Sequence, residues 1–463
     1  MPITRLTIFG LALFGATFFS LAQETSVEQT GASLRASAGK VSIVPPFPTR
    51  MGGFFDRTDT FTGVKSPVFA RALVCATEDD AVAVVTTDLL WMPRNLADAV
   101  RETAASRTTL KPDHILLSAA HNHSAPAGFS EQSLFGGPHN PELFAFMRDA
   151  LTDAIVEAYA ELRPAQLSYG AGLLEHFSRN RQQNNDTVVD PEVGVLKIAE
   201  ADSRIVIATL FNFTGHPVVL GSGNLLICGE YPGAAEQFVE DAIGGVALFT
   251  QGACGDVTVH RSGDPYLEVE RLGRVLGAEV IKTAETAPRS EMEVLYSRLE
   301  DVEVEPRVFP ERKEAELNRD DLKNQLADAK QRGTNAAAIL RLEKELDSAE
   351  WGVRIATLTQ ERPGALPLVD RAPVHVMQIG PLVLVGIPGE LFVEYGLEIK
   401  QRVRQSKDRP LMVVGFANDY LGYLVTPRAV HTGGYEQATA RLQASAPRAM
   451  TEAAMQWVEE GIH

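Results

Sequence analysis

The sequence has little cysteine. Cys75, Cys228 and Cys254 form an odd and sparse set among 463 residues. This excludes a disulfide framework, and the spacing of the three is not that of a zinc finger. We expect buried free thiols, with one bridge between two of the three as the alternative.

Basic side chains are also scarce. There are 43 against 60 acidic ones, which leaves a net charge of -17. Because such a chain repels phosphate backbones, we expect no nucleic-acid partner.

The remaining composition, 45% hydrophobic and 22% charged, is that of a globular protein with a large core. No internal repeat or Pro/Ser-rich linker divides the chain, so we expect one elaborated domain over residues 23–463.

Long apolar runs are missing, with one exception near the N-terminus. The uncharged run 6–21 follows Arg5 and ends at Ser20-Leu21-Ala22, with small residues where a signal peptidase reads. These features predict a signal peptide over residues 1–22 and a secreted or periplasmic protein, with an uncleaved anchor as the alternative. No other run approaches the ~20 apolar residues of a membrane span, so we expect at most peripheral membrane contact.

Short β-rich runs alternate with amphipathic helices along the chain, which predicts an α/β fold of mixed sheets with surrounding helices. Strands are expected at 81–87, 114–118, 205–212, 246–250, 374–379, 382–385 and 411–414. Helices are expected at 141–162, 233–242, 265–285 and 434–459. The segment 310–360 is rich in Glu, Lys, Arg, Ala and Leu and is broken at 333–335, which predicts a helical-hairpin insertion beside the active-site cleft.

Polar side chains follow several of the apolar strands. His121 and His123 are two residues apart on an extended segment and therefore share a face, so one can bind a metal while the other meets the substrate. His216 closes a second strand, and Glu390 follows the apolar run 382–386. Two histidines, a glutamate and a further oxygen donor suit a catalytic zinc with an open position for water. Core histidines and a solvated loop glutamate are the alternatives.

Two further loops offer reactive groups. The Gly-rich loop 251–258 carries Asp256 and Thr258, and its glycines allow backbone N–H groups to approach a ligand closely. An ordinary turn is the alternative. Tyr420 and Tyr423 follow a later strand and provide two phenols, unless they pack in the core or at its rim.

Six motifs, in this order along the chain, resemble those of the neutral/alkaline non-lysosomal ceramidases. They cover roughly residues 46–435. They are His121-Asn-His123-Ser-Ala-Pro-Ala-Gly128, Phe213-Thr-Gly-His216-Pro217, 224–233, 251–258, Pro388-Gly-Glu390 and 418–427. The resemblance implies a zinc ion held by four residues: His121, His216, Glu390 and one tyrosine, for which we choose Tyr423 over Tyr420.

The resemblance also implies catalytic roles for residues around the metal. His123 would face the substrate carbonyl or the leaving amine. In the mechanism that we expect, the metal and His123, with help from Arg181 or Tyr420, stabilise the oxyanion. Asn180-Arg181 matches the family's Asn-Arg pair, with Arg179 as the adjacent rival, and Asp256 would orient its neighbours. Thr258 occupies the place of the family's serine and keeps its hydroxyl.

The chain departs from the family at Thr258, at Glu230 and Tyr231 (Asp and Asn in the family) and in the segment 310–360. These departures bear on ceramide more than on zinc hydrolysis. We therefore expect a zinc-dependent amidohydrolase in which zinc-bound hydroxide cleaves a small-molecule or lipid N-acyl substrate such as ceramide. The alternatives are a zinc hydrolase of small polar amides, lactams or esters, and a non-catalytic binding protein on the same fold.

Overall fold

The computed structural model describes residues 34–130, 136–182, 188–364 and 366–462, which all lie in one compact unit. The predicted signal peptide, residues 1–22, lies outside the described residues. Within them, no helix has the length and apolarity needed to cross a bilayer. The three cysteines are buried free thiols, as the sequence predicts.

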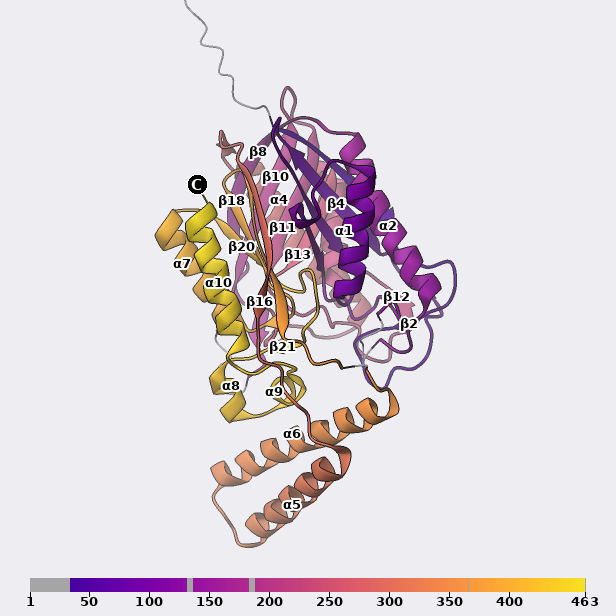
Figure 1. Ribbon diagram of the computed structural model, residues 1–463, viewed down its shortest axis with the longest axis vertical. Coiled ribbons are helices and arrows are strands. Elements are labelled where there is room, and N and C mark those ends of the chain that lie inside the picture. The colour runs from indigo at the N-terminus through magenta and orange to yellow at the C-terminus, as the bar shows by residue number, and fades with distance from the viewer. Residues whose placement is uncertain (1–33, 131–135, 183–187, 365, 463) are drawn as a thin grey trace, which may run out of the picture. The chain divides into compact units, whose positions relative to one another are not determined.

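A nine-stranded mixed sheet forms the centre of the fold (Figure 1). Its order is β13-β11-β10-β8-β1-β4-β5-β6, with β15 beside β8. The strands are β1 (Arg35–Ser42), β4 (Phe69–Ala76), β5 (Ala81–Thr87), β6 (Ile115–Ala119), β8 (Arg163–Leu173), β10 (Glu192–Glu200), β11 (Val206–Phe213), β13 (Val246–Gln251) and β15 (Arg289–Ser290).

A second sheet has four strands in the order β16-β17-β18-β20. These are β16 (Leu295–Glu303), β17 (Arg371–Ile379), β18 (Leu382–Gly386) and β20 (Leu411–Val414). The helices are α1 (Arg94–Arg107), η1 (Pro112–His114), α2 (Pro141–Ala160), α3 (Glu230–Ile243), α4 (Pro265–Thr286), α5 (Arg312–Gln331), α6 (Ala336–Glu361), α7 (Val393–Lys407), α8 (Pro427–Thr432), α9 (Tyr435–Thr439) and α10 (Ala446–Gly461).

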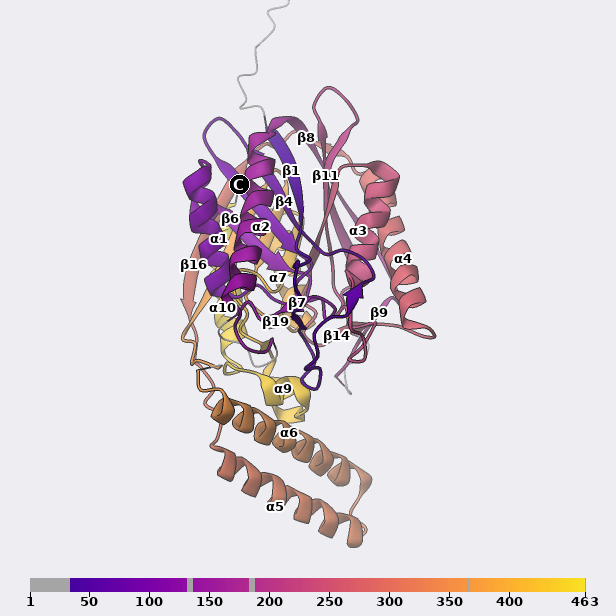
Figure 2. The same cartoon turned by 90° about the vertical axis from the view of Figure 1, so that its right-hand side faces the viewer.

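The two sheets pack face to face between outer layers of helices (Figures 1 and 2). Strand alternation produces these layers. On β4, Val74 packs with the residues of α1 and α2, while Leu73 faces the second sheet. On β17, Met377 faces the large sheet, while Val376 packs toward α7 and α10. Helices α3 and α4 cover the other half of the large sheet. The predicted mixed α/β fold with surrounding helices is confirmed.

A buried ion network joins the large sheet to α3. The Arg71 guanidinium on β4 lies 3.0 Å from the Asp88 carboxylate and 2.9 Å from Glu236 on α3. Removing the cation leaves buried carboxylates unpaired, so we expect Arg71→Met to lower the free energy of unfolding by about 3–5 kcal/mol. Arg107→Met, which breaks an exposed ion pair with Asp153, should cost less than about 1 kcal/mol. Denaturant unfolding of both variants checks this, and equal losses would contradict it.

The candidate site residues follow the carboxyl ends of parallel strands. The pairs β5–β6, β11–β13 and β18–β20 are parallel, and ligands gather outside such ends. Four short strand pairs then hold the loops in register. They are β2 (Arg50–Met51) with β7 (Pro126–Ala127), β3 (Gly63–Val64) with β12 (Leu226–Ile227), β9 (Ser178–Asn180) with β14 (Val257–Val259), and β19 (Glu390–Leu391) with β21 (Tyr423–Leu424).

The predicted hairpin is present as α5 and α6, and Asn335 caps α6 by accepting a hydrogen bond from the amide of Ala338. The single helix predicted over 434–459 is wrong. This segment forms α9 and α10, and Leu442 between them pairs with Pro306 in a β-bridge. Pro447 lies in the first turn of α10, where its missing N–H costs nothing, whereas a continuous helix would place it in the interior.

Candidate metal centre

Backbone carbonyls fix the rings of two histidines. His121 Nδ1 lies 2.9 Å from the Leu90 carbonyl oxygen, and the ring stacks on Phe416 with centroids 4.2 Å apart. His216 Nδ1 lies 3.0 Å from the Val257 carbonyl oxygen. Because a carbonyl only accepts, each Nδ1 donates, and this leaves the lone pair of each ring on Nε2.

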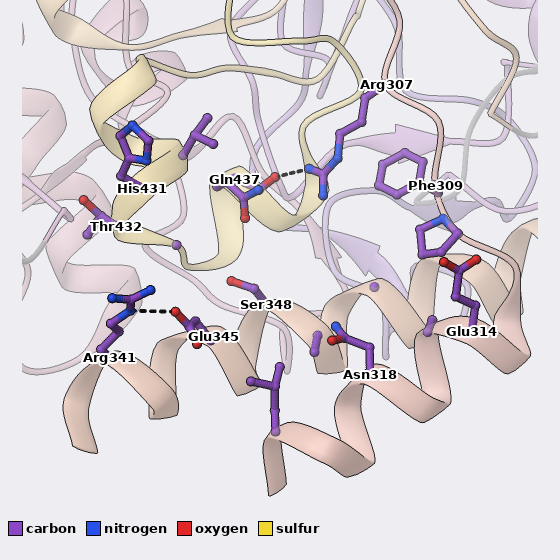
Figure 3. Close-up of a pocket in the computed structure, with 17 residues that line it drawn as sticks. Arg307, Phe309, Glu314, Asn318, Arg341, Glu345, Ser348, His431, Thr432 and Gln437 are labelled. Atoms are coloured by element: carbon purple, nitrogen blue, oxygen red, sulfur yellow. Dashed lines mark hydrogen bonds and ion pairs between the residues drawn. The ribbon is translucent and has the colours of Figure 1, made fainter. Parts of the chain in front are cut away.

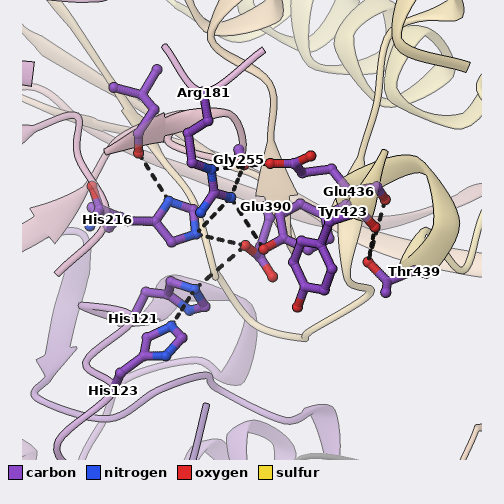
Figure 4. Close-up of polar contacts among 12 residues, drawn as sticks. His121, His123, Arg181, His216, Gly255, Glu390, Tyr423, Glu436 and Thr439 are labelled. Atoms are coloured by element: carbon purple, nitrogen blue, oxygen red, sulfur yellow. Dashed lines mark hydrogen bonds and ion pairs between the residues drawn. The ribbon is translucent and has the colours of Figure 1, made fainter. Parts of the chain in front are cut away.

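Both Nε2 atoms face the carboxylate of Glu390 (Figure 4). The Glu390 Oε2 atom lies 3.5 Å from His121 Nε2 and 3.1 Å from His216 Nε2. Ligand atoms of the three residues lie within 4.8 Å of one another, and all three side chains are buried. Three lone-pair atoms that converge in this way can hold a cation. Two imidazole nitrogens and a carboxylate match the donor set of catalytic zinc sites, so the predicted trio can hold a metal ion.

The electrostatics of the site keep the imidazoles neutral. Burial lowers the pKa of His121 to about 3 and that of His216 well below its usual value. Metals bind the neutral ring, so the fold supplies both histidines in their binding form at ordinary pH. The carbonyl partners on Nδ1 hold the orientation of each ring in the way that metal-binding histidines are commonly held.

The structure brings both candidate tyrosines to Glu390. Tyr420 donates its hydroxyl proton to Glu390 Oε1 at 2.6 Å. Tyr423 pairs directly with Glu390 between β19 and β21, and its hydroxyl oxygen accepts from Arg181 Nη2 at 3.3 Å. Burial raises the pKa of both phenols. A metal takes a lone pair of the phenol oxygen, and both tyrosines bring one to this group, so the choice of Tyr423 over Tyr420 stays a prediction.

His123 lies beside the three metal-binding candidates. Its Nε2 is 3.2 Å from His121 Nε2, but its ligand atoms fall outside the 4.8 Å group. Phe54 packs edge-on against its ring at 4.9 Å. Gly53, with φ of 99°, passes so close that a Cβ there would lie 2.2 Å from His123 Nδ1. Only glycine fits at position 53, and the close backbone limits the movement of the His123 ring. The ring lies beside the metal-binding group, and its substrate-facing role stays a prediction.

The predicted Asn180-Arg181 pair reaches the centre, and the rival Arg179 does not. Arg181 Nη2 lies 3.5 Å from His216 Nε2 and donates to the Gly255 carbonyl at 2.7 Å. Arg179 is exposed. Alternation along β9 sends Arg179 to the side opposite the buried Asn180, and Arg181 follows the end of the strand.

Asp256 ties the surrounding loops together, as the sequence predicts. Its carboxylate accepts from Asn180 Nδ2 at 2.7 Å and from the amide of Val393 at 2.8 Å, and its backbone carbonyl accepts from the Arg181 amide. Burial raises the pKa of Asp256 to about 6. Thr258 forms a β-bridge with His216, which places it next to a candidate ligand.

Sequence reasoning missed Tyr435 and Glu436. The Glu436 carboxylate lies 3.1 Å from Arg181 Nε, and the Tyr435 ring packs against Tyr423 with centroids 5.5 Å apart. A carboxylate directly after Gly433-Gly434-Tyr435 was the available signal. The helix predicted over 434–459 gives this carboxylate no role at the site.

Glu230 provides a pH-dependent contribution to stability. Its buried carboxylate accepts from the amides of Val219 and Leu220, each at 3.1 Å. Burial outweighs these bonds and raises its pKa from 4.5 to about 7. The folded state therefore binds the Glu230 proton more tightly than the unfolded state does. This tighter binding stabilises the fold fully below pH 4.5, and the stabilisation is lost as the pH rises through 7.

We expect Glu230→Gln, which cannot titrate, to gain about 3 kcal/mol relative to the wild type between pH ~4.5 and ~7.5. The amide leaves one backbone donor without its acceptor, but this cost is the same at every pH. Urea unfolding of both proteins across this range checks the prediction. A difference between the two proteins that does not vary with pH would contradict it.

The fold and the site together define a mixed α/β protein with a buried His/His/Glu group that can hold a metal ion. Residues 38–265 match the profile of the neutral/alkaline non-lysosomal ceramidase family, N-terminal domain. The chain is 25% identical to the neutral ceramidase of Pseudomonas aeruginosa over 450 residues, covering 83% of this chain and 66% of that protein. It is 23% identical to the neutral ceramidase of Mycobacterium tuberculosis over 400 residues, covering 74% and 62%.

The likeness extends to solved structures. The crystal structure of the Pseudomonas aeruginosa neutral ceramidase aligns with a TM-score of 0.73 at 20% identity, over 93% of this chain and 74% of that one. A ceramidase complexed with C2 aligns with a TM-score of 0.71. The solved structures show that the chain has a ceramidase-like fold. Residues 38–265 match the N-terminal domain of the neutral/alkaline ceramidase family, and the chain is a distant homologue of neutral ceramidases. The alignments with the two curated relatives span 62–66% of their lengths.

Proposed function

We propose that the protein is a zinc-dependent amidohydrolase that cleaves the amide bond of an N-acyl substrate such as ceramide. The observation that carries the proposal is the convergence of His121 Nε2, His216 Nε2 and a Glu390 carboxylate oxygen at one buried point. Three lone-pair donors without a cysteine are the set that a catalytic zinc site uses. The named relatives are neutral ceramidases, which supports an amide as the bond and a lipid as one substrate.

The residues around the metal have separable tasks in this proposal. Bound zinc would supply a water of lowered pKa and polarise the scissile carbonyl. Tyr420 holds the Glu390 carboxylate in place through its 2.6 Å hydrogen bond. The Arg181 guanidinium is the fixed positive charge nearest to His216, and it is placed to stabilise negative charge that develops on the carbonyl oxygen.

His123 is the group placed to move a proton. It is neutral, because burial holds its pKa well below the usual value, and its Nε2 points to the same region as His121 Nε2. A neutral imidazole can accept a proton from the attacking water and pass it to the departing amine. Thr258, beside His216, would place its hydroxyl within the same pocket.

Metal removal and restoration test this function. The protein, stripped with a chelator and then reloaded with zinc, should lose and regain the release of amine from a panel of short-acyl and long-acyl amides that includes ceramide. Hydrolysis unaffected by the chelator would defeat the zinc proposal. Activity confined to lactams, esters or small polar amides would select the first alternative. Zinc and ligand binding without turnover of any of these compounds would indicate a binding protein.

We also propose export to the periplasm or the exterior, on the basis of the apolar run and the Ser-Leu-Ala site before residue 23. The mature protein should begin near Gln23. Intact-mass measurement on protein from the native host checks this directly. A full-length chain beginning at Met1 in the cytoplasm would contradict it.

A further inference from the structure

One residue of the hairpin touches two loops that border the metal centre. The Trp351 ring on α6 lies 4.7 Å from the Tyr435 ring and 5.2 Å from the Phe55 ring. One turn further along α6, Arg354 lies over both Phe55 and Trp351 and forms an ion pair with Asp56. A single face of α6 therefore joins the segment after α8 to the loop between β2 and β3.

Each of these loops contacts a residue of the centre. On one side, Tyr435 packs against Tyr423, which pairs with Glu390. On the other side, Phe54 packs against His123, and Arg57 at the end of the same loop donates to the His123 carbonyl at 2.5 Å. Aromatic contacts thus run unbroken from Trp351 to Tyr423 in one direction. In the other direction, Trp351 packs against the ring of Phe55, the chain neighbour of Phe54, which contacts His123.

The hairpin also packs against the body of the protein at Ile355 of α6, which is buried against Phe309 and Leu366. A cavity of about 550 Å³ lies between its two helices and residues 430–437 (Figure 3). Ala315 is the buried residue of α5 within the described part of the chain. Ser348, which lines the cavity, accepts through its Oγ from the Gly434 amide at 3.0 Å. The contact of the hairpin with the two loops is thus concentrated around Ser348, Trp351 and Arg354.

We propose that Trp351 is a positioning residue for the metal centre: it braces the Tyr435 and Phe55 loops, and through them Tyr423 and His123. The kinetic part of this inference rests on the proposed amidohydrolase function. A rigid indole between two rings holds both at fixed separation, whereas a smaller side chain leaves each loop free to shift. A shift of about 1 Å at reacting groups is enough to slow a reaction about 100-fold.

The first test needs neither metal nor substrate. Hydrogen exchange of metal-free protein should be about 10-fold faster in residues 52–57 and 433–439 of Trp351→Leu than in the wild type. Trp351→Phe keeps an aromatic ring and should restore most of the protection. Leu317→Ala, on the exposed side of α5 where Leu317 is 64% exposed, is the matched control and should change neither segment. Unchanged exchange in Trp351→Leu would overturn the inference.

The second test separates positioning from substrate contact. Zinc-loaded Trp351→Leu should retain its metal and lose about 10- to 100-fold in kcat on short-acyl and long-acyl amides alike, with KM changed less than about 2-fold. A rise in KM confined to long-acyl amides would instead make Trp351 part of the substrate-binding surface. A full truncation, Trp351→Ala, is not needed. If it fails to fold, Trp351→Leu and Trp351→Phe still decide whether Trp351 positions the two segments. A wild-type protein that cleaves no amide defeats the proposed function alone, since the exchange result stands by itself.

Discussion

Alanine at His121, His216 or Glu390 is expected to weaken zinc binding at least about 100-fold and to abolish turnover. Loss of a residue that merely supports a ligand costs 10- to 100-fold in metal affinity, so loss of a ligand should cost no less. Each of the three contributes one lone pair to a single buried point, and the two that remain cannot complete a catalytic site. Zinc per chain after dialysis, together with amide turnover, is the measurement.

Two further variants sharpen this result. Glu390→Gln keeps the shape of the side chain and an acceptor for the Tyr420 hydroxyl but removes the charge, so zinc should bind weakly to a protein of nearly normal stability. His114→Ala removes another buried histidine, whose Nδ1 bonds to the Ala81 carbonyl. It precedes β6, whereas His121 follows the other end of that strand, so the zinc content should be unchanged. Full zinc occupancy in His216→Ala would place the metal elsewhere.

Much of the fold was predictable because local patterns decide it. The apolar runs at 81–87 and 246–250 became β5 and β13 with nearly unchanged bounds. The charged segment with a break at 333–335 became α5 and α6. The single helix predicted over 434–459 is wrong for two reasons. Pro447 can only begin a helix, and the bridge between Leu442 and Pro306 holds the preceding residues in an extended form. That partner lies far away in the sequence and leaves no local pattern.

The candidate site divides in the same way. His121, His216 and Glu390 each follow an apolar strand, and parallel strands bring such ends together, so their convergence was predictable. Trp351 and Glu436 were not, because their importance comes from packing between distant elements. Nothing near Trp351 in the sequence indicates that Tyr435 and Phe55 meet on its two sides.

His123→Ala is expected to keep its zinc and to lose about two to four orders of magnitude in turnover. That is the range for removing a general acid/base or an oxyanion donor. The metal should stay because the ligand atoms of His123 fall outside the group formed by His121, His216 and Glu390. Turnover should fall because its ring, held by Phe54 and by the Gly53 backbone, is the neutral imidazole beside that group.

The measurement is zinc content beside turnover of fatty-acyl and short-acyl amides. His123→Gln, which keeps a hydrogen-bond donor but cannot carry a proton, separates the two roles. Recovery of most of the turnover would assign His123 to oxyanion stabilisation, and no recovery would assign it to proton transfer. Loss of zinc from His123→Ala would make His123 a ligand in place of one of the three. Full activity would remove it from the reaction and leave Arg181, whose Nη2 lies 3.5 Å from His216 Nε2, as the group proposed to stabilise the oxyanion.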